Sequence, residues 1–286
     1  MALITIILGL FTERFLGSLE EYRRYSWFEK FCAWAQNVSR NNTLLDGWIG
    51  AAGTVFSVVL LVAFVEHQIS EWFSAAGFLF GLVVFVFCLG PKSFYSHVKE
   101  YCGAVDSGNV ASAQWHLELL LGRPLSETEI QNMPSSMIQV LFTIAHHRLF
   151  AVVFWFVLFG PAGAVFFRLC HQAAGIVQGS SDFAQSMRSI YKWAAWPTAR
   201  ITAFSYAVTG NFVEGIARFK NSGDMKTSVA ADENERILIA SGLGASGVSV
   251  SDASTNDVMV ALALVRRTGV FVIGLIALAT LAGWAG

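Results

Sequence analysis

Charged residues are scarce in this sequence. They make up 14% of its 286 residues, whereas a soluble domain of this length carries about 25%. Hydrophobic residues reach 55%, and the mean hydropathy is +0.54. This excess of apolar side chains is typical of a chain whose main solvent is a lipid bilayer. The formal net charge of −1 offers no basic face, so no nucleic-acid partner is expected.

Cysteine is also scarce, and its positions are scattered. The four cysteines form no CxxC pair and have no metal-like spacing, so we expect unpaired thiols. They are Cys32, Cys88, Cys102 and Cys170. Among the six histidines only His146 and His147 are adjacent, and neighbours on a helix point about 100° apart. No metal site is therefore expected, and the sequence identifies no cofactor.

The sequence contains several long uncharged runs. Four stretches of nineteen residues carry no charge, namely 47–65, 72–90, 149–167 and 268–286. Each spans about 28 Å as a helix, close to the roughly 30 Å of membrane hydrocarbon. A fifth stretch, 193–213, is long enough but contains Pro197 and Arg200. We therefore expect an all-α, polytopic helical membrane protein with about five transmembrane helices in a single domain over residues 1–286.

The first apolar run, 2–11, is only about 15 Å long as a helix, too short to span by itself. It lacks the basic start and the small-residue cleavage site of a signal peptide, so we expect it to remain in the mature protein. Three placements stay open for it: crossing the membrane, lying flat on its surface, or re-entering.

Lysine and arginine positions predict the orientation. If 47–65, 72–90, 149–169, 193–213 and 268–286 all cross, then 15 of the 19 basic residues fall on one side. That side should be cytoplasmic, with cytoplasmic regions at about 12–46, 91–148 and 214–267. The other four basic residues flank or occupy 168–200 and do not fit this pattern well.

The polar regions contain amphipathic helices and loops. Residues 110–121 place apolar side chains at helical spacing, which predicts a helix packed against the bundle or the membrane surface. Residues 122–136 predict a loop with a short acidic turn, and 241–256 a flexible Gly/Ser-rich loop. The Gly-rich motif within 242–247 matches GxGxxG but lacks the strand that a dinucleotide site needs before it. "STND" at 254–257 predicts a capping box that opens the last helix.

A helix breaker, Gly160-Pro161-Ala162-Gly163, interrupts the apolar run 149–167. Proline removes a backbone donor and clashes with the preceding turn, so the freed carbonyl groups need partners inside the protein or from water. Two interpretations stay open: a polar cavity beside the break, or a kink that lets neighbouring helices fit.

Nine polar residues are candidates for a ligand-binding vestibule that faces the cytoplasm. They are Glu13, Arg14, His97, Tyr101, His146, His147, Arg148, Arg168 and Arg200. Ionisable groups inside membranes are costly and usually face a bundle interior or a wet cavity. The vestibule would attract an anionic small molecule or a protein partner. The alternative is that these side chains are interfacial anchors at helix ends. No catalytic residue is identified.

The sequence resembles the AmpE family of membrane proteins over its whole length. The resemblance rests on "HHRLFAVVFWFVLFGPAGAVFFRL" (146–169), "FTERF" (11–15) and "WAAWPTARITAFSYAVTGNF" (193–212). It implies a multi-pass protein of the bacterial inner membrane. It also implies a sensor or signal transducer linked to β-lactamase induction, cell-wall recycling and the antibiotic response.

AmpE is in turn similar to the CobD/CbiB family of cobalamin-pathway membrane proteins, which join an aminopropanol group to adenosylcobyric acid. The "PLFW…GAPGA…YR" block of that family corresponds to Phe154-Trp155, residues 160–164 and Arg168 here, and "W-x-PAR-LTA" to 196–203, with the proline one residue earlier. The acidic "ENTVDG" block is replaced by residues 145–150, and the tyrosine by Phe167. The resemblance therefore does not carry over the polar site or the reaction of the synthase.

Three functions are consistent with these features. The leading hypothesis is a regulatory or signalling protein of the AmpE type. The alternative is a membrane-embedded enzyme on a CobD/CbiB-like scaffold with altered amide- or phosphoester-forming chemistry. A small-solute transporter comes third, because a broken helix is typical of transporter sites but the sequence shows no inverted repeat.

Overall fold

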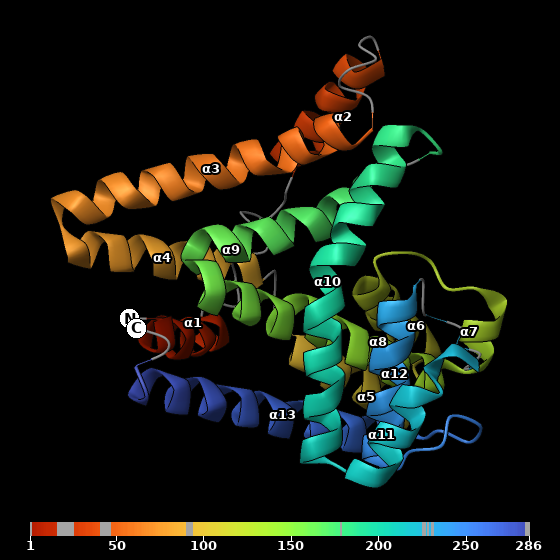
Figure 1. Cartoon of the computed structure of the whole chain (residues 1–286). Coiled ribbons are helices and arrows are strands. Elements are labelled where there is room, and N and C mark those ends of the chain that lie inside the picture. The colour runs from red at the N-terminus through yellow and green to blue at the C-terminus, as the bar shows by residue number, and fades with distance from the viewer. Residues whose placement is uncertain are drawn as a thin grey trace. The chain divides into compact units, whose positions relative to one another are not determined.

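The computed structural model describes residues 2–15, 26–40, 47–89, 94–177, 179–224, 227, 229 and 232–283. Every regular element in these residues is a helix (Figure 1), which confirms the all-α prediction. Within the described part of the chain, four segments are long and apolar enough to cross a membrane: Trp48–Trp72, Ala75–Asp106, Met133–Ile176 and Thr255–Leu281. The chain is therefore a multi-pass membrane protein. The predicted span 193–213 is not among the four.

The helices form two compact units, one of which is inserted into the other along the chain. The first comprises Met1–Lys92, Ala151–Pro197 and Ala277–Gly286, and the second Ser93–Phe150 and Thr198–Ile276. The first unit holds α1 (Ala2–Phe15), α2 (Ser26–Arg40), α3 (Trp48–Trp72), α4 (Ser74–Leu89), α9 (Ala151–Ile176) and the first part of α10 (Asp182–Thr209). The second holds the rest of α10, α5 (Phe94–Asp106), α6 (Val110–Leu121), α7 (Glu127–Gln131), α8 (Met133–Ala145), the π-helix η1 (His146–Phe150), α11 (Phe212–Lys220), the 3-10 turn η2 (Ser222–Asp224), α12 (Glu233–Ser246) and most of α13 (Thr255–Leu281).

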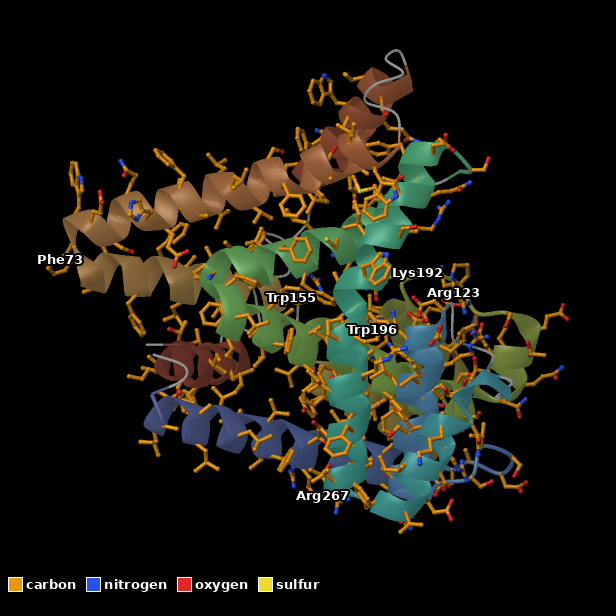
Figure 2. The ribbon with its side chains drawn as sticks, viewed as in Figure 1. Phe73, Arg123, Trp155, Lys192, Trp196 and Arg267 are labelled. Atoms are coloured by element: carbon orange, nitrogen blue, oxygen red, sulfur yellow. The ribbon has the colours of Figure 1, made fainter. Side chains whose placement is uncertain are left out.

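In the first unit, α3 and α4 form a hairpin. Its turn is the single extended residue Phe73 (Figure 2), so residues 66–71, which separate the uncharged runs 47–65 and 72–90, are helical. Leu60, Leu61 and Phe64 on α3 are 61–66% exposed, as expected of side chains that face lipid. Helix α1 packs against α4, where a Cβ added at Gly9 would lie 2.5 Å from the ring of Phe85. The short N-terminal run is therefore a helix that packs within this unit.

Helix α9 contains a reversal of chain direction. Phe159 (φ −133°, ψ 20°) and Gly160 (φ 61°, ψ −151°) leave the helical region, and the positive φ suits glycine. The rings of Trp155 and Phe166 lie 5.1 Å apart, although eleven residues of straight helix extend about 16 Å. The two limbs of α9 therefore fold back on each other (Figure 1). The run 149–169 is therefore not one straight helix, and the break is more than a simple kink. The prediction that it makes a single crossing stays a prediction.

In the second unit, α12 extends through the first six residues, 241–246, of the segment predicted to be a flexible loop. A Cβ at Gly242 would lie 2.6 Å from the ring of Phe142 on α8, and one at Gly244 would lie 2.5 Å from the carbonyl oxygen of Glu214 on α11. The prediction of a loop over 241–256 is wrong for 241–246 because these glycines permit close helix packing. The GxGxxG motif lies on a packed helix face.

Two other predictions in this unit are confirmed, and one segment is more helical than predicted. Helix α6 buries Ala113 and Leu117 as the periodicity predicted, and begins at the cap Asn109. The segment 122–136 contains α7 and the start of α8, so it is more helical than predicted. The capping box at the start of α13 is confirmed, because Asp257 accepts from the backbone N–H of Ser254 and its own backbone N–H donates to Oγ of Ser254.

Candidate functional site

A group of seven polar residues, here called the polar cluster, lies in the second unit. Its members come from three elements: His146 and His147 from η1, Thr198 and Arg200 from α10, and Glu233, Asn234 and Glu235 from α12. Three of the nine candidates predicted from the sequence, His146, His147 and Arg200, belong to it.

The π-helical turn η1 positions the two histidines. It continues α8 without a break and widens the helix over His146–Phe150, and such turns are frequent at functional sites. His146 is fully buried, and its Nε2 lies 2.8 Å from Oγ1 of Thr198. This hydrogen bond ties η1 to α10 one residue after Pro197.

The first turn of α12 supplies the acidic side of the cluster. Asp232 caps the helix, since its Oδ1 accepts from the backbone N–H of Glu235 at 3.0 Å. Arg200 donates from Nη2 to Oε1 of Glu233 at 3.0 Å and from Nη1 to Oδ1 of Asn234 at 3.2 Å. Carboxylates are favourable at a helix N-terminus because the helix dipole is positive there.

A second acid–base pair lies deeper. His147 Nε2 is 3.7 Å from Oε1 of Glu235, and the two side chains are only 12% and 16% exposed. Glu233, by contrast, is 68% exposed. The polar cluster thus runs from the buried His146 to the exposed Glu233, and it can be reached from the Glu233 end.

The remaining candidates lie elsewhere in the two units. Arg148 is half-buried on η1. His97 and Tyr101 lie on α5, where Tyr101 is buried and His97 faces His116 on α6. In the first unit, Arg168 is buried on the second limb of α9.

Glu13 and Arg14 lie near the end of α1, and their side chains are outside the described part of the structure. A vestibule shared by all nine residues stays a prediction.

Sequence reasoning missed Thr198, Glu233, Asn234 and Glu235. The sequence feature that could have indicated the three residues of α12 is "DENER" at 232–236, an acidic helix start. It does not follow an apolar span, unlike most of the candidates that were predicted. Because Glu233 pairs with Arg200, the cluster contains both signs of charge.

Two other features are relevant to ligands. A cavity of about 300 Å³ between α11 and α12 is lined by Glu214, Ala217, Arg218, Asn221 and Ala240, and so contains none of the nine candidates. Separately, ligand atoms of His97, Glu100 and His116 come within 4.8 Å of one another, a grouping that could hold a metal ion.

The fold and the polar cluster define a multi-pass helical membrane protein with a charged, partly buried site. Comparison with known proteins gives the family: residues 6–253 match the model of the CobD/CbiB proteins, and the chain belongs to this family.

Two similar curated proteins are each named cobalamin biosynthesis protein CobD. The one from Chromobacterium violaceum is 24% identical over 170 residues, 57% of this chain and only about half (52%) of that relative. The one from Stutzerimonas stutzeri is 20% identical over 216 residues, 73% of this chain and 69% of that relative. No solved structure matches the chain.

Proposed function

We propose that the polar cluster binds a small molecule that carries both an anionic group and an amine. The observation behind this proposal is the pair of acid–base contacts, Arg200 with Glu233 and His147 with Glu235. A ligand with both charges can replace each contact, its anion facing Arg200 and its amine facing Glu233. Arginine suits the anion because its planar guanidinium forms two parallel hydrogen bonds to a carboxylate or phosphate.

The family match supports an enzymatic use of this site. On a CobD/CbiB scaffold, the chain would be a membrane-embedded enzyme with altered amide- or phosphoester-forming chemistry. His147 and Glu235 supply the proton-transfer pair, because an imidazole next to a carboxylate can accept a proton from a reacting amine and be held as the imidazolium. Arg200 then orients the substrate by its anion.

A regulatory protein of the AmpE type is the second candidate. It is favoured by the replacement of the acidic "ENTVDG" block by residues 145–150, because η1 carries two histidines and an arginine at that place. In this case the ligand is sensed and not converted. The protein would act in the bacterial inner membrane, in β-lactamase induction and cell-wall recycling.

The binding step is tested with an aminoalkyl phosphate as the probe. Purified full-length protein in detergent is titrated with it by calorimetry, alongside the variants Arg200→Gln and Glu235→Gln. We expect each substitution to weaken binding by about tenfold or more, which corresponds to one charge-assisted hydrogen bond. Arg267→Gln, an exposed arginine on α13 (Figure 2), is the matched control and should bind normally. Equal affinity in all four proteins contradicts the proposal.

Two further measurements separate the candidate functions. An enzyme predicts that membrane vesicles form a product from the probe, and that Arg200→Gln abolishes it without changing the abundance of the protein. A regulator predicts that deletion changes β-lactamase induction while no product forms. Cells that show neither effect would contradict both functions.

A further inference from the structure

Outside the polar cluster, three side chains with metal-binding atoms meet between two consecutive helices. His97 and Glu100 lie one turn apart on α5, and His116 lies on α6. Their ligand atoms are all within 4.8 Å of one another. The three residues belong to the second unit, so their arrangement is internal to one compact part of the chain.

The spacing of the two histidines fits a tetrahedral ion. Their Nδ1 atoms are 3.3 Å apart. Zinc–nitrogen bonds are about 2.0–2.1 Å long, so two nitrogen ligands of a tetrahedral zinc ion are separated by about 3.3 Å. Oε2 of Glu100 lies 3.9 Å from Nδ1 of His97, whereas its 3.8 Å contact with His116 is to the other ring nitrogen, Nε2. Because the Glu100 side chain is 46% exposed, it has room to move toward an ion held by the two Nδ1 atoms.

The local structure holds the two histidines in place. Both are nearly buried, with exposures of 4% and 7%. The turn between the helices is tight, because Gly108 takes a positive φ of 73° and Asn109 caps α6. The two fixed nitrogens and the half-exposed carboxylate would make three of the four ligands of a tetrahedral ion.

We propose that His97, Glu100 and His116 bind a first-row divalent transition ion such as Zn²⁺. Two imidazoles and one carboxylate favour such an ion over Mg²⁺ or Ca²⁺, which prefer all-oxygen sites. The competing interpretation is a hydrogen-bonded histidine pair that only joins α5 to α6. The metal site does not depend on ligand binding at the polar cluster.

Trp115 provides a reporter that does not require any activity. Its ring centroid lies 4.8 Å from that of His116 and 6.3 Å from that of His97. A paramagnetic ion such as Co²⁺ at this site should quench Trp115 fluorescence. Replacing Trp115 with phenylalanine should remove most of that quenching and leave the affinity unchanged.

The test is a Co²⁺ titration of purified, metal-stripped full-length protein in detergent. Visible absorption should show one tetrahedral Co²⁺ per chain, which Zn²⁺ displaces. His97→Gln and His116→Gln should each weaken binding by about 100-fold or more, since even residues that merely orient ligands change affinity about 10- to 100-fold.

The matched control is His67→Gln. His67 pairs with Glu71 across one turn of α3 at 3.3 Å, but both side chains are more than half exposed, and among the described residues no third ligand joins them. This variant should bind Co²⁺ like the wild type.

Glu100→Gln keeps the proposal testable if a histidine variant does not fold, because Glu100 lies half in solvent and its loss leaves the buried pair intact. It should bind Co²⁺ at least about tenfold more weakly. Wild-type protein that binds no Co²⁺, or Glu100→Gln that binds it as tightly as the wild type, would overturn the proposal.

Discussion

Replacing Gly163 with alanine tests the fold-back of α9 directly. A Cβ added there would lie 2.1 Å from the carbonyl oxygen of Trp155 and 2.9 Å from the Cβ of Phe159. The first distance is more than 1 Å short of an ordinary contact, which begins at about 3.5 Å. Since the carbonyl oxygen belongs to the backbone, it cannot rotate away, and the two limbs of the helix must separate.

The loss of folding stability in Gly163→Ala follows from this overlap. Overpacking by one methyl group costs about 1–3 kcal/mol, and more when the backbone must shift. Alanine regains about 1 kcal/mol of helix propensity over glycine, so we expect a net loss of about 2 kcal/mol. Gly175 is the matched control, because it lies on the same helix, is exposed and has nothing within 4 Å of its Cβ position. Gly175→Ala should stabilise the protein by up to about 1 kcal/mol.

Thermal unfolding in detergent measures both effects. A thiol-reactive dye follows it well, since all four cysteines are buried and react only as the chain opens. At about 2–4 °C per kcal/mol, the Tm should fall by roughly 4–8 °C in Gly163→Ala and rise by about 2 °C in Gly175→Ala. In a straight membrane-spanning helix the two substitutions would have similar effects. Equal Tm changes would therefore refute the fold-back.

Three further outcomes are expected. Hydrogen bonds from Arg123 lower the pKa of the buried Glu129 from 4.5 to about 2. The ion pair therefore stabilises the fold above about pH 4.5, and the advantage of the wild type over Glu129→Gln, about 1–2 kcal/mol in thermal unfolding at pH 7, should shrink as the pH falls toward 2. Ser254→Ala removes the cap of α13 and should cost about 1 kcal/mol in the same assay. In a cysteine-free background, Ser180→Cys and Glu71→Cys should react with an impermeant maleimide from opposite sides of membrane vesicles; labelling from the same side would contradict the topology argued below.

Local patterns predicted the elements well and their long-range contacts poorly. The uncharged runs 47–65 and 72–90 became α3 and α4 because length and hydropathy decide such helices. The glycines of α12 were interpreted as a loop, since a sequence does not reveal that Phe142 and Glu214 lie against Gly242 and Gly244. Composition is ambiguous there, because the same small residues suit a flexible loop and a close helix contact.

In the candidate site, too, local patterns predicted some residues but not their partners from distant parts of the sequence. His146, His147 and Arg200 were singled out because polar residues next to apolar runs are unusual. Their partners were not, because Thr198 lies 52 residues from His146, and Glu233 lies 33 from Arg200. Helical spacing relates residues three or four apart and carries no information over such distances.

The reversal in α9 changes how the basic residues are distributed across the membrane. With a single crossing at 149–169, fifteen of the 19 basic residues share one side, and Arg168, Arg188, Lys192 and Arg200 do not fit. A helix that folds back at Gly160 returns the chain to the side from which it came, and α10 is not among the segments apolar enough to cross. With this topology we expect the four exceptions to join the other fifteen, while the α3–α4 turn and its two glutamates, Glu66 and Glu71, stay opposite. Because basic residues concentrate on the cytoplasmic side, the fold-back accounts for the four residues that a straight helix leaves unexplained.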